Sequence, residues 1–137
     1  MFSVEFIVRG VPLSAQSSGK SRQQWPRTVA EAAAKEWRDT PTDSRPLKAV
    51  ILYCSNSPSD LDADNIAKPI LDALKQVVYE DDRQIRQVLI RIWENIASAR
   101  MERPSKVLLR ALKVIHKYRD FVYVRMSDQL DLSEMPQ

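Results

Sequence analysis

The sequence contains few of the residues on which many binding and redox motifs depend. Its 137 residues include two glycines, one cysteine and one histidine. The single cysteine, Cys54, cannot form an intramolecular disulfide or a cysteine zinc cluster, so we expect a reducing, cytoplasmic setting. Because Cys54 falls in an apolar stretch, we expect a packed and inert thiol. Two glycines also leave little material for a glycine-rich phosphate loop.

Long apolar runs are absent as well. No run approaches the roughly 20 residues needed to cross a bilayer. The N-terminus lacks the positively charged lead-in of a signal peptide, so we expect no membrane partner. The length suits one domain with a single core, which we assign to residues 1–126. Residues 127–137 are polar and acidic and are expected to form a flexible tail.

The charges are segregated along the chain, although the net charge is only +3. Residues 51–82 carry seven acidic and two basic side chains, whereas residues 83–126 carry eleven basic and three acidic ones. A basic stretch of this kind favours a polyanionic partner. A solvated surface with uneven signs explains the same numbers, and charge alone does not separate the two interpretations.

Hydrophobic periodicity predicts strands and helices in alternation. Alternating or continuous apolar residues indicate strands at 2–9, 47–54, 84–94 and 120–126. Helical patterns cover about 24–39, the segment NIAKPILDALKQVV and residues 105–117. Pro69 disfavours helical geometry at Lys68, so the middle helix either begins near Pro69 or kinks there. The order indicates an α/β (α+β) fold, a small mixed sheet of about four strands with helices packed on it.

The stretch SDLDADNIAK, residues 59–68, places aspartates at alternate positions 60, 62 and 64. A calcium-binding EF-hand loop needs glycine at its sixth position and glutamate at its twelfth, where this chain has Asn65 and Leu71. The stretch SSGKS resembles the end of a phosphate-binding loop, but Ser14 stands where that loop needs its first glycine. We therefore expect neither a calcium sensor nor a nucleotide-binding loop.

Acidic residues flank two predicted elements. Asp62 and Asp64 follow a buried strand at the mouth of a helix, and Asp82 precedes the next strand. Sites in open sheets cluster at such ends. If these carboxylates meet, a hard cation such as Mg²⁺ relieves their repulsion, and a metal held in this way supports phosphodiester hydrolysis. Lys68 would counter charge on the phosphate. Alternatively, Asp64 is a helix cap and the acidic turn is merely solvated.

The segment DADNIAKPILDALKQVVYEDDRQI resembles the signature of the RusA family of Holliday junction endodeoxyribonucleases. That signature runs D-x-D-N-x-x-K, then D-A-L, then an aromatic residue shortly before D-D-x-Q. The matching positions are Asp62, Asp64, Asn65, Lys68, Asp72, Ala73, Leu74, Tyr79, Asp81, Asp82 and Gln84. The resemblance implies that Asp62, Asp64 and Asp82 bind Mg²⁺, or Mn²⁺ as a substitute, with Lys68 assisting catalysis. It implies that Asp81 is the less suited member of its pair and Asp60 an outer-shell extra.

The same resemblance implies a RusA-like fold and a small homodimer that resolves four-way DNA junctions by paired nicks in recombination and repair. A two-fold dimer would match a two-fold junction, with one site per strand. The chain departs from the family in two places. It has KQVVY where members often carry glycine before the aromatic residue, and about 25 residues between its last two strands, where members usually have a short connection.

Basic residues outside the signature are candidate DNA contacts. Residues 10–22 are expected to form a loop after the first strand, which would bring Lys20 and Arg22 to DNA. Arg83 and Arg86 follow the acidic turn, where they either hold DNA phosphates or neutralise the neighbouring aspartates.

The predicted helix 105–117 is cationic. Arg110, Lys113 and Lys117 share one face by their spacing and are candidates for phosphate binding. Two alternatives to a nuclease follow. The chain could be a catalytically silent relative that only binds junctions or other DNA, or an interaction protein that uses this helix on a protein partner.

Overall fold

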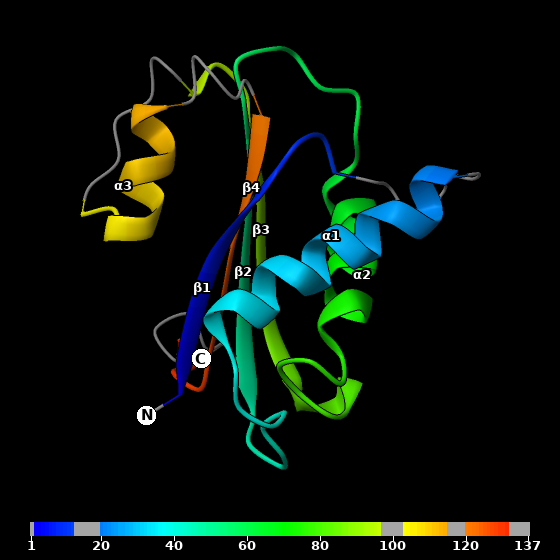
Figure 1. The fold of residues 1–137 in the computed structure, drawn as a ribbon. Helices are drawn as coiled ribbons and strands as arrows, with labels where there is room; N and C mark the ends of the chain where they lie inside the picture. The colour runs from blue at the N-terminus through cyan, green and yellow to red at the C-terminus, as the bar shows by residue number, and fades with distance from the viewer. Residues whose placement is uncertain (1, 13–19, 97–102, 115–119, 132–137) are drawn as a thin grey trace, which may run out of the picture.

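A computed structural model describes residues 2–12, 20–96, 103–114 and 120–131 of the chain. Within these ranges, four strands form one mixed sheet with three α-helices and a short 3-10 helix around it (Figure 1). In chain order the elements are β1 (Ser3–Arg9), α1 (Lys20–Glu36), β2 (Leu47–Ser55), α2 (Ala63–Leu74), η1 (Asp82–Gln84), β3 (Ile85–Trp93), α3 (Lys106–Lys113) and β4 (Asp120–Ser127). This is the predicted α+β fold.

The strands are ordered β1-β4-β2-β3, so β1 and β3 are the edges of the sheet. β4 pairs antiparallel with both β1 and β2, whereas β2 and β3 are parallel. A parallel pair needs a crossover connection, and α2 with η1 supplies it here. As a result, the start of α2 follows the end of β2, and η1 leads into the start of β3 at the other end of the helix.

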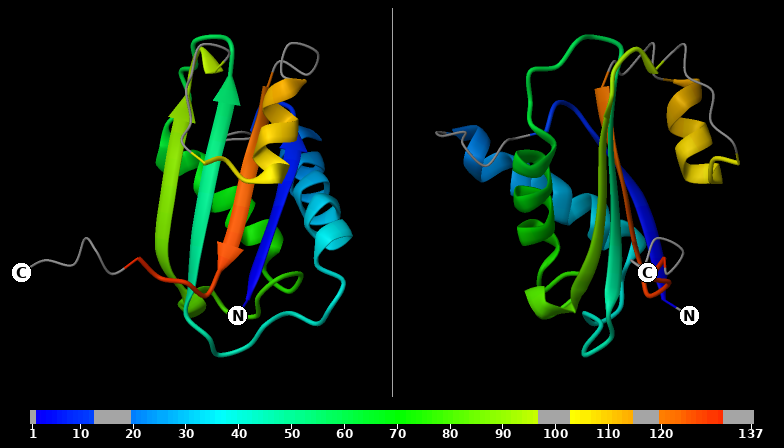
Figure 2. Two further views of the ribbon diagram at one scale, coloured as in Figure 1. Left: turned by 90° about the vertical axis from the view of Figure 1, so that its left-hand side faces the viewer. Right: turned by 180° about the vertical axis from the view of Figure 1, so that it is seen from behind.

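Helices cover both faces of the sheet. α1 and α2 pack on one face over a large core that includes Val29, Ile66 and Ile70. α3 packs on the opposite face, where Leu108 joins a smaller cluster with Phe121 and Tyr123. Figure 1 and the right-hand view of Figure 2 show the sheet edge-on, with α1 and α2 on one side and α3 on the other. Anything attached to α3 is therefore separated from α2 by the sheet.

The strand predictions hold because each strand has the apolar pattern that its position requires. In the edge strand β1, Val4, Phe6 and Val8 are buried and alternate with more exposed residues. β2 lies between two strands and is apolar on both faces, as its continuous run LKAVILYCS predicted.

The predicted start of α1 was wrong. The helix begins at Lys20 rather than near residue 24 and ends at Glu36 rather than 39. Lys20 and Arg22 are therefore placed in the first turn of α1 and not in a loop. The segment KSRQQ lacks apolar periodicity, but lysine, arginine and glutamine are good helix formers, so it extends the helix from its Ala-rich part. Pro26 lies inside the helix.

α2 also starts earlier than one interpretation of Pro69 predicted. The helix runs from Ala63 to Leu74 with Pro69 inside it, so a start near Pro69 is wrong. Buried Ile66 lies before the proline, and Ile70 and Leu74 lie after it. Packing of this continuous apolar face anchors both halves, which outweighs the cost of the missing amide proton.

α3 begins where its cap predicted. The Ser105 hydroxyl accepts a hydrogen bond from the Leu108 amide at 3.2 Å. The helix ends at Lys113, and Lys117 lies outside the described residues. No helix in the described ranges has the length and apolar character required to cross a membrane.

The first residues of the expected flexible tail are bonded to the body of the protein. The Asp128 carboxylate accepts a hydrogen bond from the Phe2 amide at 3.0 Å and lies 3.1 Å from the Arg45 guanidinium. The backbone of Asp131 makes two hydrogen bonds with the Gln87 side chain, at 2.6 and 2.7 Å. Residues 132–137 lie outside the described part of the chain.

Candidate active site

A groove runs between α2 and the edge strand β3 and gathers part of the acidic segment. Its volume is about 520 Å³. Its charged rim consists of Asp64, Lys68, Asp72 and Asp82, and we call it the carboxylate groove. Apolar side chains complete the lining, among them Leu71, Ile85, Val88 and Ile90. The groove is therefore a polar rim over an apolar floor, at an edge of the sheet.

The helical repeat places three of these charges in a row. Asp64, Lys68 and Asp72 are four residues apart along α2 and share one face of the helix. The Lys68 ammonium lies 3.7 Å from a carboxylate oxygen of Asp72, and both side chains are exposed. The buried face of α2 fixes the helix against the sheet, so its charged face points outward over β3.

Asp62 lies just before the helix. Its backbone is extended, with φ −90° and ψ 136°, and its side chain makes no capping bond. The Asn65 side-chain amide lies 3.5 Å from an Asp62 carboxylate oxygen, so the asparagine of the D-x-D-N segment is a neighbour of this acid. Asp62 is not among the residues that line the carboxylate groove.

The adjacent acids Asp81 and Asp82 have different surroundings. Asp81 caps η1: its carboxylate accepts hydrogen bonds from the Arg83 amide at 2.9 Å and from the guanidinium at 3.0 and 3.3 Å. These bonds from Arg83 lower the pKa of Asp81 to about 2. Asp82 lines the carboxylate groove, and Asp81 does not. In this structure Arg83 neutralises its neighbour, one of the two roles considered for it.

Gln84 holds this turn together from within the protein. It is buried, and its side-chain oxygen accepts hydrogen bonds from the amides of Glu80 and Asp81 at 2.9 and 3.0 Å. Its nitrogen donates to the carbonyls of Thr42 and Arg45 at 3.0 and 3.3 Å. No structural role for Gln84 was predicted, although an aspartate followed three residues later by glutamine is a capping-box pattern.

Two residues hold Asp82 at the groove. Tyr79 is fully buried; its hydroxyl donates to the Leu71 carbonyl at 2.7 Å and lies 3.4 Å from one Asp82 oxygen. The Lys75 ammonium lies 3.4 Å from the other oxygen. Burial, reinforced by the Asp82 charge, raises the pKa of Tyr79, so the phenol stays protonated. Neither role was predicted, because both contacts depend on how the chain returns from α2 to β3.

The carboxylate groove suits a hard divalent cation in the type of its donors. Asp64, Asp72 and Asp82 offer the oxygen ligands that Mg²⁺ prefers. However, no three histidine, cysteine, aspartate or glutamate side chains within the described ranges gather closely enough to hold one ion. The structure thus places Asp64 and Asp82 on one groove, leaves Asp62 outside its lining, and does not gather the three acids around a common point.

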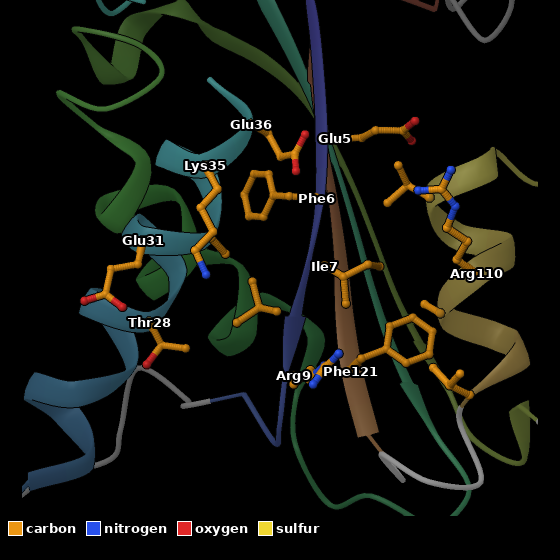
Figure 3. Close-up of a pocket in the computed structure, with 15 residues that line it drawn as sticks. Glu5, Phe6, Ile7, Arg9, Thr28, Glu31, Lys35, Glu36, Arg110 and Phe121 are labelled. Atoms are coloured by element: carbon orange, nitrogen blue, oxygen red, sulfur yellow. The ribbon is translucent and has the colours of Figure 1, made fainter. Parts of the chain in front are cut away.

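The other basic candidates lie away from this groove. Arg83 and Arg86 line a separate hollow of about 470 Å³. Arg110 and Lys113 are exposed on α3, beyond the sheet. Figure 3 shows Arg110 facing β1 across a third hollow of about 640 Å³, between α1 and α3. For the remaining candidates in the first turn of α1, Lys20 and Arg22, the structure describes no side-chain positions.

Together, the fold and the groove define a small α+β domain with acidic residues and a lysine exposed at one sheet edge. A sequence profile described as endodeoxyribonuclease RusA matches residues 15–102, more than half of the chain. The chain therefore belongs to the RusA endodeoxyribonuclease family. The match includes α1, β2, α2, η1 and β3, and hence the whole carboxylate groove, whereas β1, α3 and β4 lie outside it. No curated protein matches the chain significantly.

Proposed function

We propose that the protein is a Mg²⁺-dependent, structure-selective endodeoxyribonuclease that resolves four-way (Holliday) junctions by paired phosphodiester hydrolysis, in recombination and repair. Family membership supports endodeoxyribonuclease activity. The observation that carries the proposal is the carboxylate groove, where Asp64, Lys68 and Asp82 line one open surface. Mn²⁺ would substitute for Mg²⁺, and a cytoplasmic location fits an enzyme that acts on DNA.

Charged residues in the groove and near it in the chain have separate roles in this proposal. Asp62, Asp64 and Asp82 would hold the metal, which supplies a hydroxide nucleophile and stabilises the leaving oxygen when bound. Lys68 is exposed and would balance negative charge on the scissile phosphate. Lys75 fixes the orientation of Asp82 through their 3.4 Å contact.

DNA contacts outside the groove would come from the basic residues Lys20, Arg22, Arg83, Arg86, Arg110, Lys113 and Lys117. Those on α3 are on the opposite face of the sheet from the groove, so they would meet a different part of a branched substrate. A homodimer would provide one groove for each of the two strands to be cut.

The test is a cleavage assay on a synthetic four-way junction with each strand labelled in turn, beside a linear duplex of the same sequence. We expect paired nicks in the junction with Mg²⁺ or Mn²⁺, no cleavage with EDTA, and little cleavage of the duplex. Absence of junction cleavage with both metals would refute the proposal. Equal cleavage of the duplex would refute junction selectivity while leaving the nuclease in place.

One observation favours a second function, a catalytically silent relative that binds junctions or other DNA. The described carboxylates do not gather into a three-ligand group. This alternative predicts salt-dependent junction binding that persists in EDTA, with no nicking in either metal. A mobility-shift assay run beside the cleavage assay separates the two functions, because only the nuclease converts bound junction into nicked product.

A further inference from the structure

The edge strand β1 forms the floor of the hollow between α1 and α3, which we call the β1 groove (Figure 3). Its volume is about 640 Å³, and residues from both helices line its walls. β1 and β3 are opposite edges of the sheet, so the β1 groove is separate from the carboxylate groove. β1 and α3 also lie outside the match to the family profile, so membership of the family does not account for this feature.

Hydrogen bonds at the two ends of β1 show which of its backbone groups face the groove. The Gly10 amide donates to the Asp120 carbonyl, and the Phe2 carbonyl accepts from the Asp128 amide, both at 3.1 Å. Bonded pairs recur at every second residue of an antiparallel ladder, so the even-numbered residues of β1 turn their amides and carbonyls toward β4. The odd-numbered residues turn theirs away from β4, and no described strand pairs with them.

The unpaired backbone of β1 determines what kind of ligand the groove suits. Glu5 and Ile7 are odd-numbered residues, and both line the groove. The ligand that satisfies a row of alternating amides and carbonyls is another extended main chain, which adds to the sheet as a further strand. β1 contains neither proline nor lysine, two residues that commonly block such pairing at a sheet edge.

The α3 side of the groove is apolar at its centre. Ile7 points to this side and packs against the smaller core cluster, and Val107 and Ala111 of α3 pack against the same cluster and line the groove. Glu5 also points to this side, where its carboxylate accepts a hydrogen bond from the Tyr123 hydroxyl. An added strand would place the side chain opposite Ile7 among these residues, so that side chain should be apolar.

The α1 side is polar and mainly acidic. Glu31, Lys35 and Glu36 are exposed on this wall, and none of them belongs to a salt bridge within the described residues. Two carboxylates outnumber one ammonium, so side chains directed at α1 should be basic. The other cations of the groove, Arg9 and Arg110, are on the α3 side and would be separated from these basic side chains by the added strand.

We propose that the β1 groove binds an extended segment of a partner protein that alternates apolar and basic side chains and pairs antiparallel with β1. Antiparallel pairing is slightly more stable per residue than parallel pairing. The apolar side chains of the segment face α3, the basic ones face α1, and its main chain bonds to Glu5 and Ile7. This interaction needs neither metal nor DNA, so it does not depend on the proposed nuclease function.

The synthetic peptide KVKVKTK is a probe for such a segment, with its fourth residue, a valine, placed opposite Ile7. We expect the peptide to shift the amide resonances of Glu5 and Ile7 saturably and to slow hydrogen exchange at the Ile7 amide. Exchange at the Val8 amide, which already faces β4, should change little. The charge-reversed peptide EVEVETE should bind more weakly. Absence of a saturable shift at Ile7, or equal binding of the two peptides, would overturn the proposal.

N-methylation of the probe distinguishes strand addition from simple charge attraction. With the valine opposite Ile7, the amide of the fourth residue donates to β1, whereas the amide of the fifth residue points away from it. We expect methylation of the fourth amide to weaken binding by about tenfold, and methylation of the fifth to leave it nearly unchanged. The proposal fails if both methyl groups have the same effect.

A charge reversal on α1 tests the orientation of the segment. Glu31→Lys should weaken binding of KVKVKTK by about threefold and strengthen binding of EVEVETE. Asp60→Lys makes the same change of charge outside the groove and should alter neither. If the two variants weaken binding equally, only net charge matters and the proposal is wrong.

A single-stranded DNA oligonucleotide serves as the competing ligand. We expect it to leave the amide resonances of Glu5 and Ile7 unchanged, because the nearer wall is acidic. An oligonucleotide that shifts both amides, when KVKVKTK does not, would assign the groove to nucleic acid and refute the proposal. Because these measurements use no junction and no metal, failure of junction cleavage leaves their outcome unaffected.

Discussion

The Tyr79 hydroxyl lies 3.4 Å from a carboxylate oxygen of Asp82, which links a fully buried side chain to an acid at the rim of the carboxylate groove. The same hydroxyl donates to the Leu71 carbonyl at 2.7 Å, so the contact also ties Asp82 to the last turns of α2. The position of Asp82 therefore depends on the core. Substitution of a buried residue that does not contact a substrate should therefore change the position of Asp82 in the groove.

Tyr79→Phe tests this link. We expect the free energy of unfolding to fall by about 1 kcal/mol, because the Leu71 carbonyl loses one of its two hydrogen bonds, and the nicking rate to fall because Asp82 loses a positioning contact. Urea unfolding and the junction assay measure the two effects. Tyr53→Phe removes the hydroxyl of another buried tyrosine outside the groove and should leave nicking unchanged. Equal nicking rates for the two variants would contradict the role of Tyr79.

Asp64→Asn should abolish cleavage while leaving the fold intact. We expect nicking to fall by about 100-fold or more, because an amide replaces a ligand of the proposed metal. Junction binding in a mobility-shift assay should persist, and the melting temperature should change little. Asp60→Asn, an exposed neighbour that does not line the groove, is the control. The assignment fails if both substitutions affect nicking to the same extent.

Gln84→Glu should destabilise the protein through the turn before β3. A carboxylate cannot donate to the carbonyls of Thr42 and Arg45, so we expect a loss of about 2 kcal/mol in the free energy of unfolding. The same change at exposed Gln24 in α1 should be nearly neutral. Chemical denaturation of both variants measures the difference, and a neutral Gln84→Glu would show that the turn does not need this donor.

The Asp81 cap predicts a pH dependence of stability. Hydrogen bonds from Arg83 lower the pKa of Asp81 from 3.8 to about 2, so the folded state favours the ionised carboxylate. This stabilisation is present above the ordinary pKa and is lost as the pH falls through the lowered one. The difference in melting temperature between the wild type and Asp81→Ala should therefore narrow as the pH falls from about 4 to about 2.

Arg83→Ala provides the control for that experiment. It removes the partner that lowers the pKa of Asp81. The difference in melting temperature between Arg83→Ala and the double variant Arg83→Ala, Asp81→Ala should therefore depend less on pH than the difference between the wild type and Asp81→Ala. If Asp81→Ala changes the melting temperature with the same pH dependence whether or not Arg83 is present, then a group other than Arg83 causes that pH dependence. The Arg83 side chain is exposed and that of Asp81 is about half-exposed, so the effects should also weaken as salt is added.

Cys54 should be unreactive in the native protein. Burial raises the pKa of its thiol to about 12, so the thiol is protonated at about pH 8. The sulfur is also buried, so a reagent cannot reach it. We expect no labelling by a thiol reagent until the protein is unfolded in urea, when one thiol per chain should react. Rapid labelling of the folded protein would contradict the buried position.

The strands could be predicted from the sequence because burial imposes a pattern on them. Alternation in β1 and the continuous apolar run of β2 each follow from their place in the sheet. Helix boundaries were harder to predict from the sequence. The start of α1 at Lys20 depends on polar helix-forming residues that show no apolar periodicity. Of the two alternatives that Pro69 left open, a helix start near the proline is wrong, because packing of Ile66 is a tertiary effect that local rules do not include.

The signature segment indicated which acids to examine, and the structure shows how their surroundings differ. Asp64 and Asp82 could be predicted from the motif. The different positions of Asp81, which caps η1, and Asp82, which lines the groove, follow from the backbone of η1 and from the contact between Asp81 and Arg83. Lys75 was not predicted to contact Asp82, because that contact bridges the turn after α2. Which face of the sheet α3 occupies is likewise decided by packing and not by its own sequence.

That placement of α3 has a consequence for how the molecule can evolve. The sheet separates Arg110 and Lys113, which are on α3, from the acids near α2. The match to the family profile also ends before α3. The helix can therefore gain or lose positive charge, or acquire a new ligand, with little mechanical effect on Asp64 or Asp82. If the proposed function is right, DNA binding by α3 and cleavage at the groove can therefore change independently of each other.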